Sequence, residues 1–589
     1  MEWQGLLALG LTVGALLVLI FTRLAAHLVM LGVLIILSVA GVLTPGEAFS
    51  GFSNQGMLTV AAMFVVAAGI HGSGGVDLLV NHLLRHPKTV RAAQMRIALP
   101  VALLSAFLNN TPVVATMIPA VRGWAKRIDV APSKLMIPLS YAAIMGGTLT
   151  LIGTSTNLVV NGQYQELTGE PGFSLFSITA VGLPVLIVGV LYMFLVFPKH
   201  LPDRREKDLF GNLREFTLEV AVASDGPLVG QTVAAAGLRD LKRIYLVEIE
   251  RAGVIIPAVG SEEPLQGGDR LVFAGDTEAI SDLLRIKGIV PSTDGEPTLA
   301  QEHLERRLVE AVISPHSHCI NQTVRDAQFR ERYGAVVLAV ARNGERVSGN
   351  LGNTKLKPGD TLLLEARPAF VSRQRYTKDF LLINDLGTEA PRHQRAYLSW
   401  GILLGLILLA AFNVLSMLNA AFLGAALMLI SGCCSAQQAQ KSLDPTVLLT
   451  IAASFALGNA LYKTGVAQWL ADGMLTLGMG HPILLLILTY IAVWMLTETI
   501  TNNAAAILML PVVLELTQKA SLNPEPFLLA VMMAASASFS TPLGYQTNLM
   551  VYGPGSYRFT DFIKAGIPLS LLVGATTVTV LALGWPLAR

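Results

Sequence analysis

The chain has 589 residues, of which 53% are hydrophobic and 14% are charged, and its mean hydropathy is +0.57. This composition excludes an ordinary soluble globular protein and is typical of a protein that lies mostly within a membrane. The formal net charge of +2 is too small to indicate a nucleic-acid partner. The three cysteines, Cys319, Cys433 and Cys434, have neither the spacing of metal ligands nor that of a disulfide framework.

Apolar runs long enough to cross a hydrocarbon layer of roughly 30 Å recur in two blocks, residues 5–200 and 397–587. The first run begins at Gly5 with no basic residue before it and no cleavage site after it, so we expect a membrane anchor and not a signal peptide. Each block predicts three spans, one segment broken by polar residues, and two further spans. In the first block these segments are 5–22, 28–43, 51–72, 97–121, 132–162 and 174–198.

The two blocks resemble each other in sequence. Residues 58–74 (LTVAAMFVVAAGIHGSG) match residues 449–465 (LTIAASFALGNALYKTG). Residues 105–119 (SAFLNNTPVVATMIP) match residues 497–511 (TETITNNAAAILMLP). In each pair the apolar residues fall at matching positions, which is expected of an internal repeat.

The polar breaks also fall at matching positions. Asn110 aligns with Asn502 in the two broken segments, and residues 152–157 (IGTSTN) align with residues 543–548 (LGYQTN). Apolar helices often look alike by chance, but chance does not place polar breaks at equivalent positions. We therefore interpret the two blocks as copies of one unit.

The distribution of basic residues indicates how the copies are oriented. If each broken segment enters and leaves the membrane on one side, each half crosses five times and the second half is inverted. Nearly all basic residues of the connecting segments then lie on one side, which the positive-inside rule assigns to the cytoplasm. We therefore expect both termini outside, in a multi-pass protein of the cell membrane, the inner membrane in a bacterium. The cytoplasmic basic residues would be Arg85, Lys88, Arg91, Arg96, Arg122, Lys126, Arg127, Lys134, Arg204, Arg205, Lys207, Arg558 and Lys564.

The broken segment of the first half, residues 103–120 (LLSAFLNNTPVVATMIPA), holds two asparagines, a threonine and a proline at its centre. Pro112 lacks an N–H group and disfavours helix just before it, so we expect two half-helices to meet there. Irregular backbone at membrane depth is tolerated only where it is buried in protein or lines a watery cavity. The N-terminal amides of half-helices suit an anion, and asparagine oxygens suit a hard cation such as sodium. Two inverted hairpins and two broken spans are the layout of a secondary transporter.

A polar residue in a membrane span can also do no more than join helices by hydrogen bonds. Four breaks matched in pairs favour a binding site instead. Neither tip carries Arg, Lys or His, so an anion there would depend on amides, hydroxyls, helix ends and bound cations. Because burial of an uncompensated dianion is costly, we expect obligatory coupling to a cation.

The paired Asn-Thr tips, each followed by a G-T-x-x-N type segment, resemble those of the divalent anion/sodium symporters. These are the sodium/sulfate and sodium/dicarboxylate cotransporters of the ion-transporter superfamily, and the resemblance covers nearly all of both membrane blocks. In that family a Ser-Asn-Thr triplet at each tip binds sodium and substrate; the corresponding residues here are 109–111 (NNT) and 501–503 (TNN). The family's G-T-P-P-N type segments correspond to 153–157 (GTSTN) and 544–548 (GYQTN), without the double prolines and with Tyr545 where a threonine is usual.

The resemblance implies two sodium sites with an anion between them, in a homodimer whose transport domains move by an elevator mechanism. The departure at Tyr545 bears on the choice of anion more than on sodium. The sodium ligands would be Ser105, Asn109, Asn110, Gly153 and Asn157 in the first half, and Thr497, Asn502, Gly544 and Asn548 in the second. The anion would contact Asn110, Thr111, Thr154, Ser155, Asn502, Asn503, Gln546 and Thr547.

Glu498 is the only acidic residue deep within the predicted spans, and its counterpart in the first half is Ala106. Carboxylates inside a membrane are commonly functional. Glu498 could relay protons, add to cation binding, or make a structural hydrogen bond, and the sequence leaves these roles open.

The insert between the blocks, residues 203–395, is a second repeat with a spacing of 91, which aligns Gly268-Asp269 with Gly359-Asp360. Each copy predicts short strands with hairpin turns, at 251–253 (RAG) and at 343–344 (NG). The copies resemble the C-terminal domain of TrkA-type potassium-uptake regulators (RCK-C). No GxGxxG motif follows a predicted strand, so the nucleotide-binding partner domain of those regulators is not expected.

The predicted fold is therefore a polytopic α-helical membrane protein with two inverted repeats, each of five spans and one re-entrant hairpin, and a soluble α+β tandem-domain insert. The insert would lie in the cytoplasm, where it regulates or dimerises the protein, binds an unidentified small ligand, or only stiffens the dimer. The predicted boundaries are 1–202 and 391–589 for the membrane repeats, and 203–295 and 296–390 for the RCK-C-like domains.

Three functions are compatible with these features. A sodium-coupled symporter of a small divalent anion is the leading candidate, with sulfate ahead of dicarboxylates such as succinate or malate. Sulfate is ranked first because the tips offer short polar contacts and no cation. In addition, RCK-C-like domains often accompany family members that transport inorganic anions. A cation/proton antiporter or metalloid-oxyanion exporter would need a titratable core, for which Glu498 is the candidate. A ligand-gated channel would favour one continuous pore over two opposed hairpins. No nucleophile, base or metal cluster indicates an enzyme.

Overall fold

The structure is a computed structural model, and the chain in it forms two compact units. The membrane unit comprises Met1–Asp203, Pro391–Val551 and Arg558–Arg589, and the second unit comprises Arg204–Ala390 with Tyr552–Tyr557. The structure describes residues 2–22, 24–76, 87, 89–204, 217–238, 241, 244–251, 254–257, 259–260, 262–275, 283, 286–291, 307–315, 317–342, 345–347, 351–366, 370, 374, 377, 379–385, 395–542 and 544–588. Several positions that enter the sequence predictions lie outside these residues: Arg85, Lys88, Arg205, Lys207, Ala252, Gly253, the boundary at 295–296, Asn343, Gly344 and Leu543.

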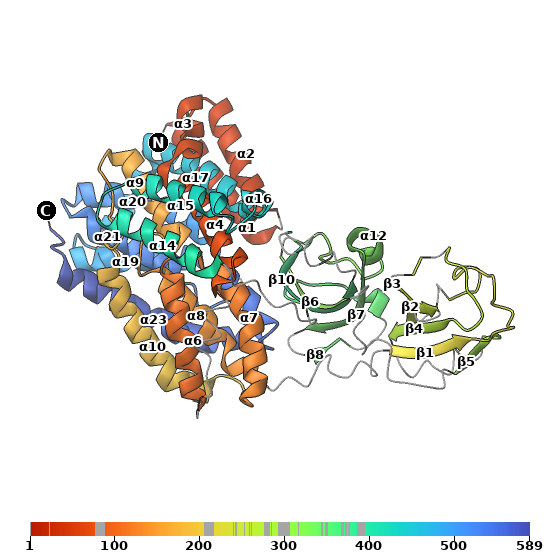
Figure 1. The fold of residues 1–589 in the computed structure, drawn as a ribbon. Helices are drawn as coiled ribbons and strands as arrows, with labels where there is room; N and C mark the ends of the chain where they lie inside the picture. Colours follow the sequence, from red (N-terminus) through yellow and green to blue (C-terminus); the bar gives the residue numbers. More distant parts are fainter. Residues whose placement is uncertain are drawn as a thin grey trace. The chain divides into compact units, whose positions relative to one another are not determined.

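The described part of the membrane unit is built of helices (Figure 1). Its first half contains α1 (Trp3–Phe21), α2 (Ala26–Val39), α3 (Pro45–Phe49), η1 (Ser50–Ser53), α4 (Gln55–Gly72), α6 (Val90–Ser105), α7 (Asn110–Arg127), η2 (Pro132–Lys134), α8 (Met136–Gly147), α9 (Ser155–Thr168) and α10 (Thr179–His200). Its second half contains α14 (Ala396–Ala411), α15 (Met417–Ile430), α16 (Ala436–Ser442), α17 (Pro445–Lys463), α18 (Val466–Leu477), α19 (Pro482–Thr497), α20 (Asn502–Lys519), α21 (Pro524–Ser536), α22 (Gln546–Tyr552) and α23 (Phe559–Gly584).

Five helical segments of the described chain are long and apolar enough to cross a membrane, namely Trp3–Phe21, Pro45–Gly72, Thr179–His200, Pro445–Lys463 and Phe559–Gly584. The apolar helices α2, α14, α15, α19 and α21 are shorter. The predicted polytopic membrane protein is thereby confirmed.

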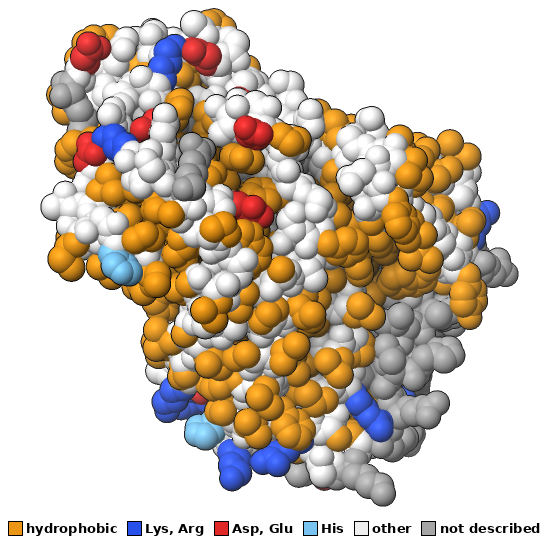
Figure 2. All heavy atoms as spheres, turned by 90° about the vertical axis from the view of Figure 1, so that its left-hand side faces the viewer, with side chains coloured by type: hydrophobic (Ala, Val, Ile, Leu, Met, Phe, Trp, Pro, Cys, Tyr) orange, Lys and Arg blue, Asp and Glu red, His pale blue; other side chains and the backbone are white. Residues whose placement is uncertain are grey.

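Hydrophobic side chains cover much of the outer surface of this unit. Figure 2 shows one face of it, where they form a broad area and basic side chains gather at the lower end. On α10, large apolar side chains recur at every fourth position and are about half exposed: Leu183, Ile187, Leu191 and Leu195. A water-soluble protein rarely leaves such a stripe uncovered, whereas lipid chains cover it without cost.

The helices end and restart where the sequence predicts polar breaks. α6 ends at Ser105 and α7 begins at Asn110, and α19 and α20 are interrupted between Thr497 and Asn502 in the same way. Pro112 does not mark the break itself. It lies in the first turn of α7, where a backbone N–H group would have no carbonyl acceptor within the helix, so the proline ring is tolerated. The further breaks at 148–154, between α8 and α9, and at 537–545, between α21 and α22, match the predicted broken spans.

Helices of the two halves pack against each other throughout the membrane unit. α2 contacts α17, α4 contacts α15, α9 contacts α20 and α10 contacts α23. The helix α8 is buried along its whole length, and its Gly146 lies directly against the backbone of Ala102 in α6. These contacts bring the breaks of the two halves into one buried region.

The described residues of the second unit form two five-stranded antiparallel sheets. The first has the order β3-β2-β4-β1-β5, with β1 (Thr217–Val222), β2 (Ile244–Arg251), β3 (Val254–Pro257), β4 (Arg270–Gly275) and β5 (Ile289–Pro291). The other has the order β10-β6-β9-β7-β8, with β6 (Arg307–Ile313), β7 (Ala335–Arg342), β8 (Glu345–Arg346), β9 (Thr361–Ala366) and β10 (Phe380–Asp385), and it carries the short helices α12 (Phe329–Tyr333) and η6 (Leu351–Asn353).

Both predicted hairpins are present in this unit. Arg251 at the end of β2 pairs with Val254 of β3, and Arg342 at the end of β7 pairs with Glu345 of β8. An equivalent ion pair lies beside each hairpin. Arg251 Nη2 is 2.8 Å from Asp269 Oδ2, and Arg342 Nη2 is 2.7 Å from Asp360 Oδ2. Residues with the predicted spacing therefore occupy equivalent positions in the two sheets.

Candidate functional site

The tip of the first broken segment is held by its own polar side chains. Ser105 Oγ, at the end of α6, donates a hydrogen bond of 2.5 Å to Asn110 Oδ1, and both residues are fully buried. Asn109 precedes α7 and accepts a hydrogen bond of 3.4 Å from the Thr111 backbone N–H. Asn110 is thus fixed at the N-terminus of an 18-residue helix, where backbone N–H groups have no helical acceptor.

The tip of the second broken segment repeats this geometry. The Thr497 hydroxyl lies 2.9 Å from Asn502 Oδ1 and 2.7 Å from the Ala535 carbonyl oxygen. Thr501 precedes α20 and accepts a hydrogen bond of 3.4 Å from the Ala504 backbone N–H. The pair Thr497 and Asn502 therefore corresponds in position and in hydrogen bond to Ser105 and Asn110.

The two later breaks are also built alike. Asn157 Nδ2 donates to the Thr150 carbonyl at 3.1 Å, and Asn548 Nδ2 donates to the Thr541 carbonyl at 3.1 Å. The Thr150 hydroxyl donates in turn to the Ala106 carbonyl at the first tip. Each asparagine closes the irregular loop before its helix, which explains why a polar residue is needed at both positions.

Hydrogen bonds join the tip of the first half to the break of the second. Asn110 Nδ2 donates to the Tyr545 hydroxyl at 2.6 Å, and Thr111 Oγ1 donates to Gln546 Oε1 at 3.2 Å. The Tyr545 hydroxyl also lies 3.3 Å from Thr154 Oγ1, and it interacts with the side chain of Asn502. Tyr545 thus contacts both tips.

The opposite pair, the tip of the second half and the break of the first, is joined as well. Asn503 Oδ1 accepts hydrogen bonds from Ser155 Oγ at 3.3 Å and from Thr156 Oγ1 at 3.0 Å. The four breaks therefore meet in one cluster of amides and hydroxyls, contributed by α7, α9, α20 and α22.

Burial divides the predicted site residues into two groups. The buried group holds Ser105, Asn110, Gly153, Thr154, Asn157, Thr497, Thr547 and Asn548. The group that remains partly or largely accessible holds Asn109, Thr111, Ser155, Asn502, Asn503, Gly544 and Gln546. Most predicted sodium ligands lie in the buried group, whereas most of the residues predicted to contact the anion lie in the accessible group.

Some residues of the cluster were not predicted from the sequence. Ser140 of α8 lies 2.9 Å from Thr547 Oγ1 and 2.7 Å from Asn548 Oδ1. Thr541 and Ser540 contact the carboxylate of Glu498. The hydroxyl-rich run at 536–541 (SASFST), directly before a predicted break, is the signal that could have identified the latter two.

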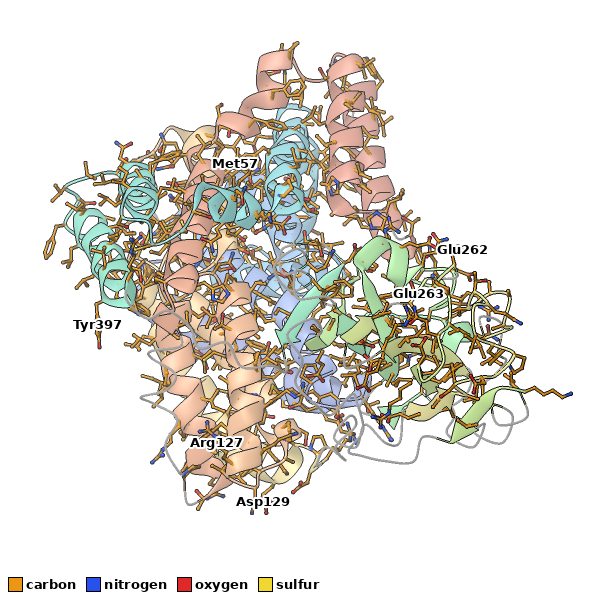
Figure 3. The ribbon with its side chains drawn as sticks, turned by 45° about the vertical axis from the view of Figure 1, so that its right-hand side comes forward. Met57, Arg127, Asp129, Glu262, Glu263 and Tyr397 are labelled. Atoms are coloured by element: carbon orange, nitrogen blue, oxygen red, sulfur yellow. The ribbon has the colours of Figure 1, made fainter. Side chains whose placement is uncertain are left out.

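The basic side chains of α7 lie away from the cluster. α7 carries Lys126 and Arg127 in its last turn, and 18 helical residues span about 27 Å. Figure 3 shows Arg127 and Asp129 at the lower end of the membrane unit and Met57 of α4 in its upper part. None of the described residues in the contacts above is Lys, Arg or His, and no group of three or more His, Cys, Asp or Glu side chains that could hold a metal occurs in the described chain.

Comparison with known proteins places this architecture among transporters. The chain matches the family described as "Citrate transporter" over residues 16–513 and 407–588. It is 35% identical to an uncharacterized transporter of Synechocystis sp., over 98% of this chain and 96% of that protein. It is 30% identical to the uncharacterized transporter YfbS of Escherichia coli, over 96% of both chains, and 26% identical to sodium/sulfate cotransporter 1 of Chlamydomonas reinhardtii, over 97% of this chain and 89% of that protein.

Proposed function

This chain belongs to the citrate transporter family, and on that premise we propose that it is a secondary active transporter that carries a small divalent anion together with sodium, with sulfate as the first candidate. The carrying observation is the meeting of both hairpin tips and both broken spans in one cluster that contains no basic side chain among the described residues. Relatives named as sodium/sulfate cotransporters support both the ion and the anion.

Oxygen atoms with unused acceptor capacity support sodium binding. Asn157 is fully buried, and its Oδ1 accepts no hydrogen bond, while its Nδ2 is already used by the Thr150 carbonyl. A buried polar atom without a partner is costly, so it indicates a missing ligand. A Cβ atom on Gly153 would lie 2.8 Å from the Ser105 carbonyl oxygen and 2.9 Å from that of Ala106. Neutral amide and carbonyl oxygens are ligands that hard cations accept.

The accessible donors around the tips support binding of an anion. The helices α7 and α20 begin at Asn110 and Asn502, so their positive ends point into the cluster. Hydroxyl and amide donors of Thr111, Asn503 and Gln546 lie beside them. With no arginine or lysine to balance a dianion, the coupled sodium ions supply the positive charge.

The size of Tyr545 favours a compact anion. Its ring is buried and its hydroxyl lies between Asn110 and Thr154, where the sequence resemblance leads one to expect a threonine. Dicarboxylates are the second candidate, because the resembled symporters include sodium/dicarboxylate cotransporters and the family's description names a larger carboxylate, citrate. The larger carboxylates need the space that Tyr545 fills.

The architecture around the site completes the proposal. The matched hydrogen bonds of Ser105 with Asn110 and of Thr497 with Asn502 support two copies of one unit. The distribution of basic residues supports their inversion, with both termini outside and residues 203–390 in the cytoplasm. The twin sheets of the second unit, with equivalent strand order, support two RCK-C-like domains that regulate transport or join two copies of the chain. The transport domain then moves by an elevator mechanism within a homodimer.

Uptake by the purified full-length protein in liposomes tests the proposal. Labelled sulfate should accumulate with an inward sodium gradient and not with an equal potassium gradient, and unlabelled sulfate should compete more strongly than succinate or citrate. Sulfate uptake driven equally well by a proton gradient in sodium-free buffer would contradict sodium coupling and favour the antiporter or exporter.

A further inference from the structure

Two glycines at equivalent positions of the repeat each face a group of oxygen atoms. A Cβ atom on Gly153 would lie 2.6 Å from the Gly147 carbonyl oxygen, 2.8 Å from that of Ser105 and 2.9 Å from that of Ala106. All three oxygens belong to the backbone. This first cluster therefore presents only neutral oxygens.

The cluster at Gly544 has a different chemistry. A Cβ atom on Gly544 would lie against Ser538 Oγ, 3.0 Å from Thr541 Oγ1 and 3.1 Å from Glu498 Oε2. Ser538 and Glu498 occupy the positions that match Gly147 and Ala106 in the first half. Side-chain oxygens, one of them a carboxylate oxygen, thus replace the backbone oxygens of the first cluster.

The carboxylate of Glu498 is held toward this point from two sides. The Ser540 backbone N–H donates to Glu498 Oε1 at 3.2 Å, and the Thr541 hydroxyl donates to Oε2 at 3.2 Å. Thr541 Oγ1 in turn accepts the Gly544 N–H at 2.9 Å. The side chain of Glu498 is therefore fixed and its second oxygen faces the space beside Gly544.

The hydroxyl of Ser538 provides an independent sign of a missing ligand. Ser538 is fully buried, and its hydroxyl lies near the Glu498 carboxylate but makes no hydrogen bond of acceptable geometry. Its contact with the Cβ position of Gly544 shows that it points into the same space. Buried hydroxyls almost always have a partner, so a further group is expected between these oxygens.

We propose that Glu498, Ser538 and Thr541 form a carboxylate-bearing site for a small monovalent cation, with sodium as the expected ion. This inference rests on the proposed function, because it assigns a fixed negative charge to the second of the two cation sites. The groups that contact Glu498 in the described chain are Ser538, Ser540 and Thr541, none of them a cation. A carboxylate inside a membrane needs a compensating charge, and carboxylate with hydroxyl oxygens suits a hard cation.

The two cation sites are then unequal. The site at Gly153 holds its ion with neutral oxygens, so its whole charge is available to balance the anion. The ion at Gly544 is balanced by Glu498 itself. We expect this second ion to bind more tightly, and to bind in the absence of the anion.

Sodium binding to the purified full-length protein in detergent tests this site without requiring transport. Binding of ²²Na⁺ would be measured for the wild type, E498Q, S538A and the control E170Q, which neutralises an exposed carboxylate. We expect E498Q to bind one sodium ion fewer per chain, S538A to bind it about tenfold more weakly, and E170Q to match the wild type.

The variant S538A keeps the test decisive if E498Q does not fold. The Ser538 hydroxyl lies near Glu498 but makes no hydrogen bond of acceptable geometry, so a purely structural serine could be replaced by alanine without loss of sodium affinity. Unchanged sodium binding in both variants, or in S538A when E498Q cannot be purified, overturns the inference. An absence of sodium binding to the wild type overturns it as well.

The inference and the proposed function fail separately. Sodium-driven sulfate uptake together with unchanged sodium binding by E498Q and S538A would leave the transporter proposal standing and remove the site. Sodium binding that depends on Glu498 and Ser538, in a protein that takes up no sulfate, would support the site and contradict the proposed substrate.

Discussion

The side-chain amide of Asn110 donates a hydrogen bond of 2.6 Å to the hydroxyl of Tyr545, although 435 positions separate the two residues in the chain. Asn110 begins α7 at the break of the first half, and Tyr545 directly precedes α22 at a break of the second half. The hydroxyl also contacts Thr154, so one phenol group links two breaks of the first half to the second half. The sequence alone suggested only that these segments lie close together.

Removal of this hydroxyl should weaken transport. In Y545F the buried amide of Asn110 loses its acceptor, at a cost of about 1–3 kcal/mol. We expect sodium-dependent sulfate uptake to fall by about tenfold or more in proteoliposomes. Tyr397 is largely exposed on α14, so Y397F is the matched control. Uptake by Y545F equal to that of Y397F would show that the phenol does not order the site.

A smaller residue at the same position should change substrate preference. Y545T restores the residue usual in the resembled symporters and removes a buried aromatic ring. We expect the ratio of succinate to sulfate uptake to rise, because the space filled by the ring becomes available. Competition of unlabelled succinate against labelled sulfate measures this ratio, and an unchanged ratio would contradict a role of Tyr545 in size selection.

The central asparagines of the two tips should both be essential. N110A removes one hydrogen-bond partner each from Ser105 and Tyr545, and N502A removes one from Thr497. We expect each variant to abolish sodium-dependent uptake while it remains monodisperse in size-exclusion chromatography. N419A replaces an exposed asparagine at the start of α15 and should transport normally. Activity in either tip variant near that of N419A would refute the paired-tip site.

Gly153 should tolerate no side chain. In G153A the added methyl group would lie within 2.9 Å of three carbonyl oxygens, so it would displace a cation and push the loop away from Ser105 and Ala106. We expect loss of sodium-dependent uptake and a lower melting temperature. The exposed Gly123 in α7 has nothing within 4 Å of its Cβ position, so G123A should stabilise the helix by about 0.5–1 kcal/mol. Equal behaviour of the two variants would show that the space beside Gly153 is not needed.

The second unit should lose stability in acid through Asp379. Burial raises the pKa of this carboxyl group. Hydrogen bonds from the backbone N–H and the ring of His318, with further contributions from Tyr333, outweigh burial, so the pKa of Asp379 is lowered overall. A lowered pKa means that the folded state prefers the ionised form. Its contribution to stability is therefore present above the pKa of the unfolded chain, about 3.9, and is lost as the pH falls through the lower folded value.

Hydrogen exchange in the full-length protein measures this effect. After correction for intrinsic exchange rates, the strands β6 and β10, which flank Asp379, should exchange faster below about pH 4 in the wild type. D379N should exchange faster already at pH 7 and depend less on pH, at a cost of about 1–2 kcal/mol. D326N, at an exposed position of the same sheet domain, is the control. A pH dependence in D379N as steep as in D326N would assign the acid sensitivity to another group.

The sequence by itself determined the features that depend on local chemistry. The length of the apolar runs predicts membrane spans, because a helix must cover the hydrocarbon layer. Pro112 and the polar residues beside it predicted a break in the first half, which the structure places before Asn110, and the matching sequence predicted a second break beside Asn502. Arg-Ala-Gly and Asn-Gly predicted the hairpins of the second unit. In each case the deciding interactions lie within a few residues of one another.

Only the tertiary structure decided which polar groups face each other. Ser140 lies in a helix that is apolar by sequence, and it reaches Thr547 and Asn548 only because α8 is buried against the second half. The sequence left the role of Glu498 open for the same reason, since its neighbours Ser540 and Thr541 are 42 and 43 positions away. Hydrogen-bond partners at such distances depend on how whole helices pack, and packing is determined by the shapes of all the surrounding side chains together.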